Sequence, residues 1–156
     1  MVRKRLICLP QDSLLLSGTV ASILDSEGLT SHAQIQSVLK QVQLWALVTE
    51  RGGIEAELQP DTLSHGERQL LATAKAVLRN RQHQGRGILI LDEATSNLDS
   101  VTAAVIHKVI ENEFKGQTVI TIAHRAEALK CCDLIVELHE GRVARMGSAE
   151  EILHAK

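Results

Sequence analysis

Aromatic side chains are almost absent from this sequence: its 156 residues contain one tryptophan, one phenylalanine and no tyrosine. Proteins that bind single-stranded nucleic acid stack the bases on aromatic rings, so the sequence excludes a site of that kind. The net charge of -2 also gives no electrostatic reason to bind a phosphate backbone. We therefore expect no nucleic-acid partner.

Long apolar runs and paired cysteines are missing as well. No apolar run approaches the roughly 18 residues that cross a bilayer, so we expect no transmembrane segment in this chain. Its thiols are Cys8 and the adjacent pair Cys131 and Cys132. An odd number of cysteines without metal-ligand spacing is typical of free thiols in a reducing compartment. The composition predicts one globular domain with a sizeable core, cytoplasmic if it is expressed alone.

A glycine-rich phosphate-binding loop is the third absence. Such a loop needs two glycines that flank four residues, followed by Lys-Ser or Lys-Thr, so that backbone amides and one ammonium surround the phosphates. None of the ten glycines of this sequence is followed by lysine. The chain is therefore not expected to hold a phosphate chain by this means.

The spacing of apolar residues predicts strands that alternate with helices, which indicates an α/β fold. A buried strand is predicted at 6–9, and strands with two apolar faces are predicted at 88–91 and 119–122. The strand at 88–91 is expected to have helices on both faces. An antiparallel pair is predicted at 134–138 and 143–146, around a turn at 139–141. Helices are predicted at 19–24, at 31–50 as one or two helices, after Ser64, at 100–114, at 124–130 and from Ser148 to Leu153.

Two of these helices have features that can be checked in detail. Ser64 and Glu67 form a capping box at the start of one helix, which makes it the best-marked helix in the chain. The helix at 100–114 is expected to bury Val101, Val105, Ile106 and Val109. The segment between 19 and 79 reads as a helix-only block inserted between the first two strands.

Asp92 and Glu93 come directly after a buried strand. In an open α/β sheet the carboxyl ends of the strands are where ligands bind. An aspartate there can hold Mg²⁺, and a neighbouring glutamate can orient or deprotonate a water that attacks a phosphate. Taken alone, the same residues are more typical of an acidic turn without function than of a metal site.

The other candidate positions are also ambiguous one at a time. Ser64 and Gly66 begin a helix whose amides could face a phosphate, but most such sequences are only helix caps. His124 follows an apolar strand and could contact a phosphate, although a single histidine there is more often structural. Gln11 follows Pro10 and could reach a metal or a water through its amide.

The order and spacing of five segments resemble the nucleotide-binding domain of ATP-binding-cassette (ABC) transporters, from about Leu6 to the C-terminus. Gln11 matches the Q-loop and His124 matches the switch histidine. Leu63–Gln69 matches the signature motif, Ile88–Glu93 matches Walker B and Ser96–Asp99 matches the D-loop. The segment from Leu9 to Val20 is most similar to the second such domain of subfamily C, multidrug-resistance-type exporters.

The resemblance implies a role for each matched residue. Glu93 and His124 would be catalytic, and Asp92 with Gln11 would bind the metal. Gln11 and Asp99 of the D-loop would contact nucleotide. The signature residues Ser64, Gly66 and Glu67 would contact ATP held by a partner. The cofactors would be ATP and Mg²⁺. His65 and Glu67 depart from the family's usual glycine and glutamine.

The resemblance also implies what surrounds this chain in the family. The fold would be a P-loop-NTPase-like parallel sheet without its P-loop strand, whose place lies between the strands at 119–122 and 134–138. A helical subdomain would occupy about 19–80, with 1–18 and 81–156 as the core part. The partners would be transmembrane domains and a second nucleotide-binding domain, at the cytoplasmic face of a membrane. Because a strand follows Met1 almost at once, we expect a partial cassette. The isolated chain would then be either a poor ATPase or a non-catalytic module that pairs with a complete nucleotide-binding domain.

Overall fold

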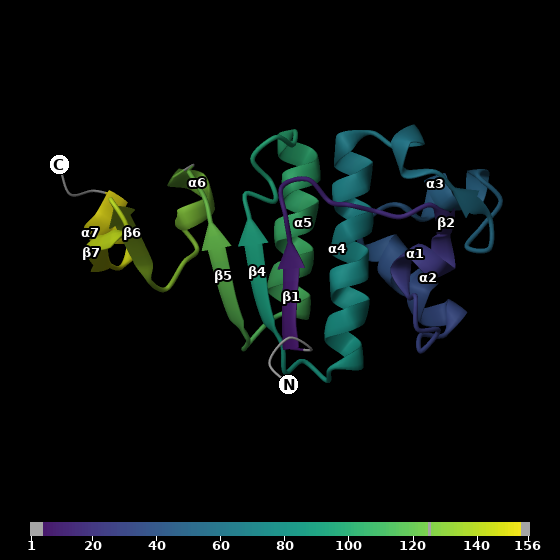
Figure 1. The fold of residues 1–156 in the computed structure, drawn as a ribbon, viewed down its shortest axis with the longest axis horizontal. Coiled ribbons are helices and arrows are strands. Elements are labelled where there is room, and N and C mark those ends of the chain that lie inside the picture. The colour runs from purple at the N-terminus through teal and green to yellow at the C-terminus, as the bar shows by residue number, and fades with distance from the viewer. Residues whose placement is uncertain (1–4, 125, 154–156) are drawn as a thin grey trace. The chain divides into compact units, whose positions relative to one another are not determined.

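The computed structural model of the protein describes residues 5–124 and 126–153. Within these residues a three-stranded sheet has the order β1 (Leu6–Leu9), β4 (Ile88–Asp92), β5 (Thr118–Ile122). Figure 1 shows β1 and β4 side by side, and they are parallel, with Leu6 opposite Ile88 and Leu9 opposite Leu91. The strands predicted from their apolar runs are confirmed.

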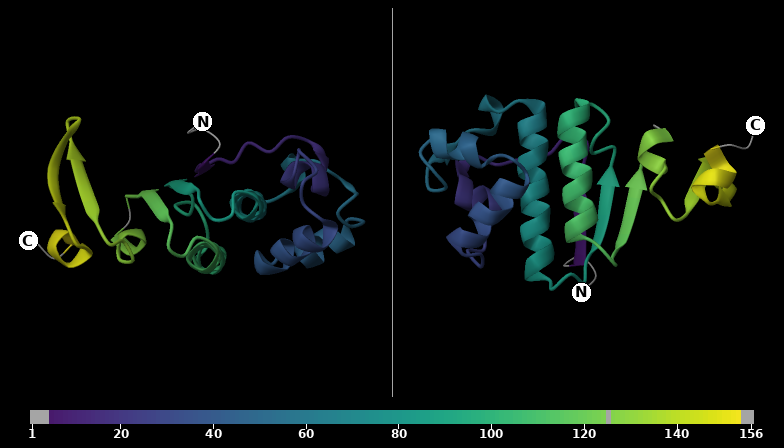
Figure 2. Two further views of the ribbon diagram at one scale, coloured as in Figure 1. Left: turned by 90° about the horizontal axis from the view of Figure 1, so that it is seen from below. Right: turned by 180° about the vertical axis from the view of Figure 1, so that it is seen from behind.

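Two long helices, α4 (His65–Gln82) and α5 (Ser100–Glu113), lie on one face of β1 and β4, as the left view of Figure 2 shows. Alternate strand residues point toward these helices and are buried, namely Ile7, Leu9, Leu89 and Leu91. On the opposite face Cys8 is exposed and Ile90 is only half-buried. The expectation of helices on both faces is therefore wrong for this part of the chain, because the described residues of the first unit place helices on one face only.

The buried side of α5 also differs from the prediction. Ile106 and Val109 are buried as expected, and Ile110 joins them, but the side chain of Val101 is 71% exposed. Val101 lies in the first turn of α5, and its periodic spacing does not by itself determine whether a packing partner is present.

The block between β1 and α4 contains α1 (Val20–Leu24), α2 (His32–Gln41), α3 (Trp45–Glu50) and a 3₁₀ turn, η2 (Pro60–Thr62). It is not helix-only as predicted. A short antiparallel pair joins β2 (Gly18–Thr19) to β3 (Glu57–Leu58), where Gly18 lies opposite Leu58. The pair is only two residues long in each strand, which is too short to give a period-2 sequence pattern. Apolar residues of α1, α2 and α4 form the core of this block.

Gly87 lies where β1 and β4 approach each other closely at their amino ends. A Cβ atom at this position would lie 3.2 Å from the carbonyl oxygen of Arg5 and 3.3 Å from Cδ1 of Ile7. Those distances are tighter than ordinary van der Waals contact, so glycine allows the two strands to pair at this end.

The chain divides into two compact units, residues 1–120 and 121–156, with the boundary inside β5. The second unit contains α6 (Ala126–Leu129), the antiparallel pair β6 (Ile135–His139) and β7 (Arg142–Gly147), and α7 (Ala149–Leu153). A two-residue turn joins β6 to β7, with positive φ at both Glu140 (50°) and Gly141 (74°). This is the backbone that a type I′ hairpin turn requires, and the predicted antiparallel pair is confirmed.

β5 is at an edge of its sheet, and within the described residues β6 pairs with β7 alone. The fold expected from the resemblance, a parallel sheet without the strand that would lie beyond β5, is confirmed. Val119, Ile120 and Ile122 of β5 are exposed. Among the described residues, none of the helices has the length and apolar character that crossing a membrane requires.

Candidate functional site

Gln11, Asp92 and Glu93 emerge at the same edge of the sheet. The parallel register places Leu9 opposite Leu91, so the residues that follow both strands leave the sheet side by side. Asp92 is exposed, whereas Glu93 and Gln11 are half-buried. The family resemblance assigns Gln11, Asp92 and Glu93 to one site, and this topology is compatible with that assignment, which stays a prediction.

The backbone of Glu93 is in the left-handed region, with φ of 49°. A side chain with a Cβ atom occupies this region at a cost of about 1–2 kcal/mol relative to ordinary backbone. Ser96 holds the conformation in place, because its backbone N–H and its hydroxyl both donate to the carbonyl oxygen of Glu93, at 3.0 and 2.9 Å. The direction in which the Glu93 carboxylate leaves the strand is therefore set by a locked turn.

Asp99 is the N-cap of α5. Its Oδ1 accepts hydrogen bonds from the backbone N–H groups of Val101 (3.0 Å) and Thr102 (2.9 Å), and its Oδ2 accepts one from the Thr102 hydroxyl (2.6 Å). These hydrogen bonds, the one from the Thr102 side chain above all, lower the pKa of Asp99. The D-loop carboxylate is thus ionised and fixed in direction at the start of a helix.

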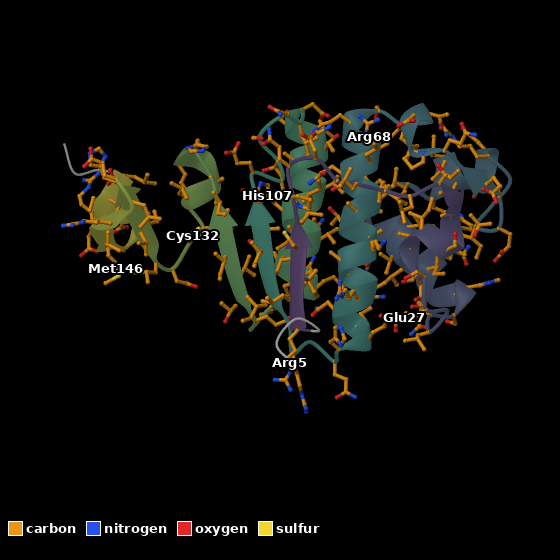
Figure 3. All side chains as sticks on the ribbon, in the orientation of Figure 1. Arg5, Glu27, Arg68, His107, Cys132 and Met146 are labelled. Atoms are coloured by element: carbon orange, nitrogen blue, oxygen red, sulfur yellow. The ribbon has the colours of Figure 1, made fainter. Side chains whose placement is uncertain are left out.

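The capping box predicted at the start of α4 is confirmed. The Ser64 hydroxyl accepts from the backbone N–H of Glu67 (3.2 Å), and Oε2 of Glu67 accepts from the backbone N–H of Ser64 (2.7 Å). Arg68, labelled in Figure 3, donates from Nη1 to the carbonyl oxygen of Leu63 at 2.7 Å. Both side chains of the box are therefore engaged within the helix start.

Gly66, in the first turn of α4, lies beside Thr102 in the first turn of α5. A Cβ atom at Gly66 would meet Cγ2 of Thr102 at 3.5 Å, which is ordinary van der Waals contact. Thr102 in turn is bonded to Asp99, so the signature segment and the D-loop segment lie beside each other. Because this chain has room for a methyl group at position 66, packing within the chain does not require glycine there.

Comparison with known proteins identifies the family to which the chain belongs. A profile of the ABC transporter family matches residues 1–96. The chain belongs to the ABC transporter family. It is 38% identical over 152 residues to an ABC-type transporter of Gibberella zeae, and 38% identical over 155 residues to ATP-binding cassette sub-family C member 2 of Rattus norvegicus; each match covers 97% of this chain and 10% of the relative.

The structural comparison agrees with the sequence comparison. A solved structure of a bacterial Atm1-family ABC exporter with ATP bound superposes with a TM-score of 0.83 at 30% identity, over 97% of this chain and 26% of that one. By length, the chain spans about a tenth of the curated relatives that it matches in sequence. It has the fold of an ABC exporter's nucleotide-binding domain over the part that it contains.

Within this ABC domain, the groups available for Mg²⁺ are few. The described residues contain no cluster of three or more His, Cys, Asp or Glu side chains placed to hold a metal. The exposed carboxylate of Asp92 and the amide of Gln11 fit an ion that takes most of its ligands from phosphate and water, as Mg²⁺ commonly does. The residues present do not fit the phosphate chain of ATP by themselves, because the sequence has no Gly-Lys step.

His124 is not among the residues that the first unit brings together. It follows β5 by two positions and belongs to the second compact unit. His107, also labelled in Figure 3, lies on α5, and its Nε2 is 3.4 Å from the hydroxyl of Thr95. The assignment of His124 as a catalytic residue stays a prediction from the family resemblance.

Three residues near the site were given no role of their own by sequence reasoning, although Ser96 and Gln69 lie at the ends of matched segments. Ser96 and Thr102 act through hydrogen bonds to Glu93 and Asp99, and polar residues in such turns are too common to be informative. Gln69 is the exception that the sequence could have revealed. It is a polar residue beside Leu70 and Leu71 on the buried side of α4, and its side chain is 1% exposed.

Proposed function

We propose that this chain is part of the nucleotide-binding domain of an ABC exporter whose complete form couples ATP binding and hydrolysis to transmembrane transport. In that complete form Glu93 would orient or deprotonate the attacking water, and His124 would contact the γ-phosphate. Asp92 and Gln11 would hold Mg²⁺. The observation that supports this most is the common sheet edge from which Gln11, Asp92 and Glu93 emerge, in a chain of this family.

The partners follow from the same proposal. A complete exporter would supply transmembrane domains and a second nucleotide-binding domain, and this chain would lie at the cytoplasmic face of the membrane. Gln11 would link the site to the membrane helices. Ser64, Gly66 and Glu67 would face ATP held by the second domain, with Asp99 beside them.

By itself the chain should be a poor ATPase, because it lacks the lysine and the amides of a phosphate-binding loop. Titration of the 156-residue chain with Mg-ATP in a calorimeter tests this directly. We expect no saturable binding in the micromolar range. Saturable micromolar binding would overturn the proposal, since it would require a phosphate site other than the family's.

A second function is favoured by the room at Gly66. A non-catalytic module could pair with a complete nucleotide-binding domain and present its α4 start to the partner's ATP. The chain itself does not need glycine at position 66, since an added methyl group would only touch Thr102 at 3.5 Å. A close approach of an outside ligand to the first turn of α4 is a reason for glycine at this position.

The pairing function is tested by adding the chain to a complete ABC nucleotide-binding domain and measuring ATP turnover. We expect stimulation that is lost in both Ser64→Ala and Gly66→Ala. Ser31→Ala is the matched control, because Ser31 and Gln34 form the same capping box on α2, away from the signature segment. Stimulation that survives Gly66→Ala in a folded chain would exclude pairing through the signature.

The exposed edge strand leads to an expectation for the isolated chain. Val119, Ile120 and Ile122 leave apolar surface on β5, at the edge of the sheet. Exposed edges of this kind favour aggregation and lower the net gain from burial. We expect marginal stability, and cooperative unfolding of a monomer well above physiological temperature would contradict it.

A further inference from the structure

Gln69 connects the Gln11 turn to the signature helix. Its amide nitrogen Nε2 donates to the carbonyl oxygen of Pro10 at 2.9 Å, and its Oε1 accepts from the hydroxyl of Ser13 at 3.0 Å. The two partners lie on either side of Gln11, 59 and 56 positions away from Gln69 in the sequence. With 1% of its side chain exposed, Gln69 is one of the most buried polar residues of the described chain.

The two hydrogen bonds use a side chain that both donates and accepts, as an uncharged amide does. The Pro10 carbonyl can only accept, so the residue on α4 must donate to it, and the same residue must accept from Ser13. A carboxylate can accept but cannot donate, and an apolar side chain can do neither. Leaving the part-buried carbonyl of Pro10 without a donor would cost free energy, because a desolvated acceptor would lose its partner.

Two of the three leucines in this segment contribute no burial. Leu14 is 96% exposed and Leu16 is 84% exposed, so neither contributes to burial. Leu15 packs against the core, and the turn before it depends on Pro10, Ser13 and their bonds to Gln69. The same helix carries Ser64 and Gly66 in its first turn.

We propose that Gln69 is a positioning residue that fixes the Gln11 turn to α4, so that the turn and the start of the signature helix are displaced together. The functional meaning of this coupling rests on the proposed function, in which Gln11 links the site to membrane helices. The hydrogen-bonded connection itself does not depend on nucleotide, and it can be tested in the chain without ATP.

The test is amide hydrogen exchange of the full 156-residue chain, compared between residues 11–16 and the helix α2. In Ser13→Ala, which removes one hydrogen bond, we expect exchange at 11–16 to rise by roughly a few-fold to tenfold. Ser17→Ala, a change of the same kind in the same segment, is the matched control and should leave the exchange of 11–16 unchanged. The rate in α2 should not change in either variant.

Gln69→Glu gives a readout that a purely structural role would not produce. At neutral pH the carboxylate cannot donate to Pro10, so we expect faster exchange at 11–16. At acidic pH the protonated carboxyl can donate and accept as the amide does, and protection should return after correction for the intrinsic rate. Unchanged exchange at 11–16 in folded Ser13→Ala would overturn the proposal, as would an increase spread equally over α2. Because no nucleotide is present, neither result depends on whether the chain takes part in ATP hydrolysis.

Discussion

The left-handed backbone of Glu93 predicts that glycine at this position gives a more stable chain than alanine does. With φ at 49°, Glu93 has a conformation that costs a residue with a Cβ atom about 1–2 kcal/mol. Glycine removes that cost, but it loses about 0.5–1 kcal/mol more conformational freedom on folding than alanine does. We therefore expect the free energy of unfolding of Glu93→Gly to exceed that of Glu93→Ala by about 0.5–1 kcal/mol.

Urea denaturation at low temperature measures the effect while limiting aggregation of the exposed edge strand. Glu93→Ala is the control, because it removes the same carboxylate but keeps the Cβ atom and therefore the strain. The difference between the two variants isolates the backbone term, whatever the Glu93 side chain contributes. If Glu93→Gly is no more stable than Glu93→Ala, the turn is not strained and the reasoning is refuted.

Three further predictions concern other parts of the chain. Glu113 accepts hydrogen bonds from Arg81, which lower its pKa, so Glu113→Gln should cost about 1.5 kcal/mol at neutral pH. This contribution exists above pH 4.5, the ordinary pKa of glutamate, and is lost as the pH falls through the lowered value, so the variant and the parent should converge in acid denaturation. Glu140→Asn should raise the melting temperature, because Asn tolerates the positive φ of the turn before Gly141 better than Glu does; an unchanged or lower melting temperature would contradict this. Ile120→Lys should reduce self-association, measured by light scattering, without loss of the helical circular dichroism signal, because Ile120 is 48% exposed on the edge strand. Equal aggregation of the variant and the parent would show that another surface is responsible.

Local sequence signals predicted the elements that depend on local physics. The capping box of Ser64 and Glu67 starts α4 where expected, and the turn before Gly141 joins two strands, because both are set by a few adjacent residues. The strands β1, β4 and β5 were visible as apolar runs for the same reason. The candidate residues Gln11, Asp92 and Glu93 could be placed because all three lie at or just after the carboxyl ends of two neighbouring parallel strands.

The features that the sequence did not predict depend on contacts between distant residues. Strands with two apolar faces indicated helices on both faces. Whether a face is covered depends on segments that lie far away in the sequence. Within the described residues of the first unit, helices cover one face of β1 and β4 only. Val101 fits the period of a buried stripe, yet it is 71% exposed. The bonds of Gln69 to Pro10 and Ser13 join residues more than 50 positions apart, which no local pattern records.

Gly87 has a consequence for how mutations in this chain would be interpreted. A side chain at position 87 would press on the carbonyl oxygen of Arg5 and on Ile7, so the amino ends of β1 and β4 would have to shift by about a few tenths of an ångström. Since the register of those strands also determines where Gln11 leaves the sheet, a substitution at Gly87 would misplace the Gln11 turn from the opposite end of the strand pair. A genetic screen for loss of function would then identify Gly87 together with the residues of the site, although its role is to set the spacing between two strands.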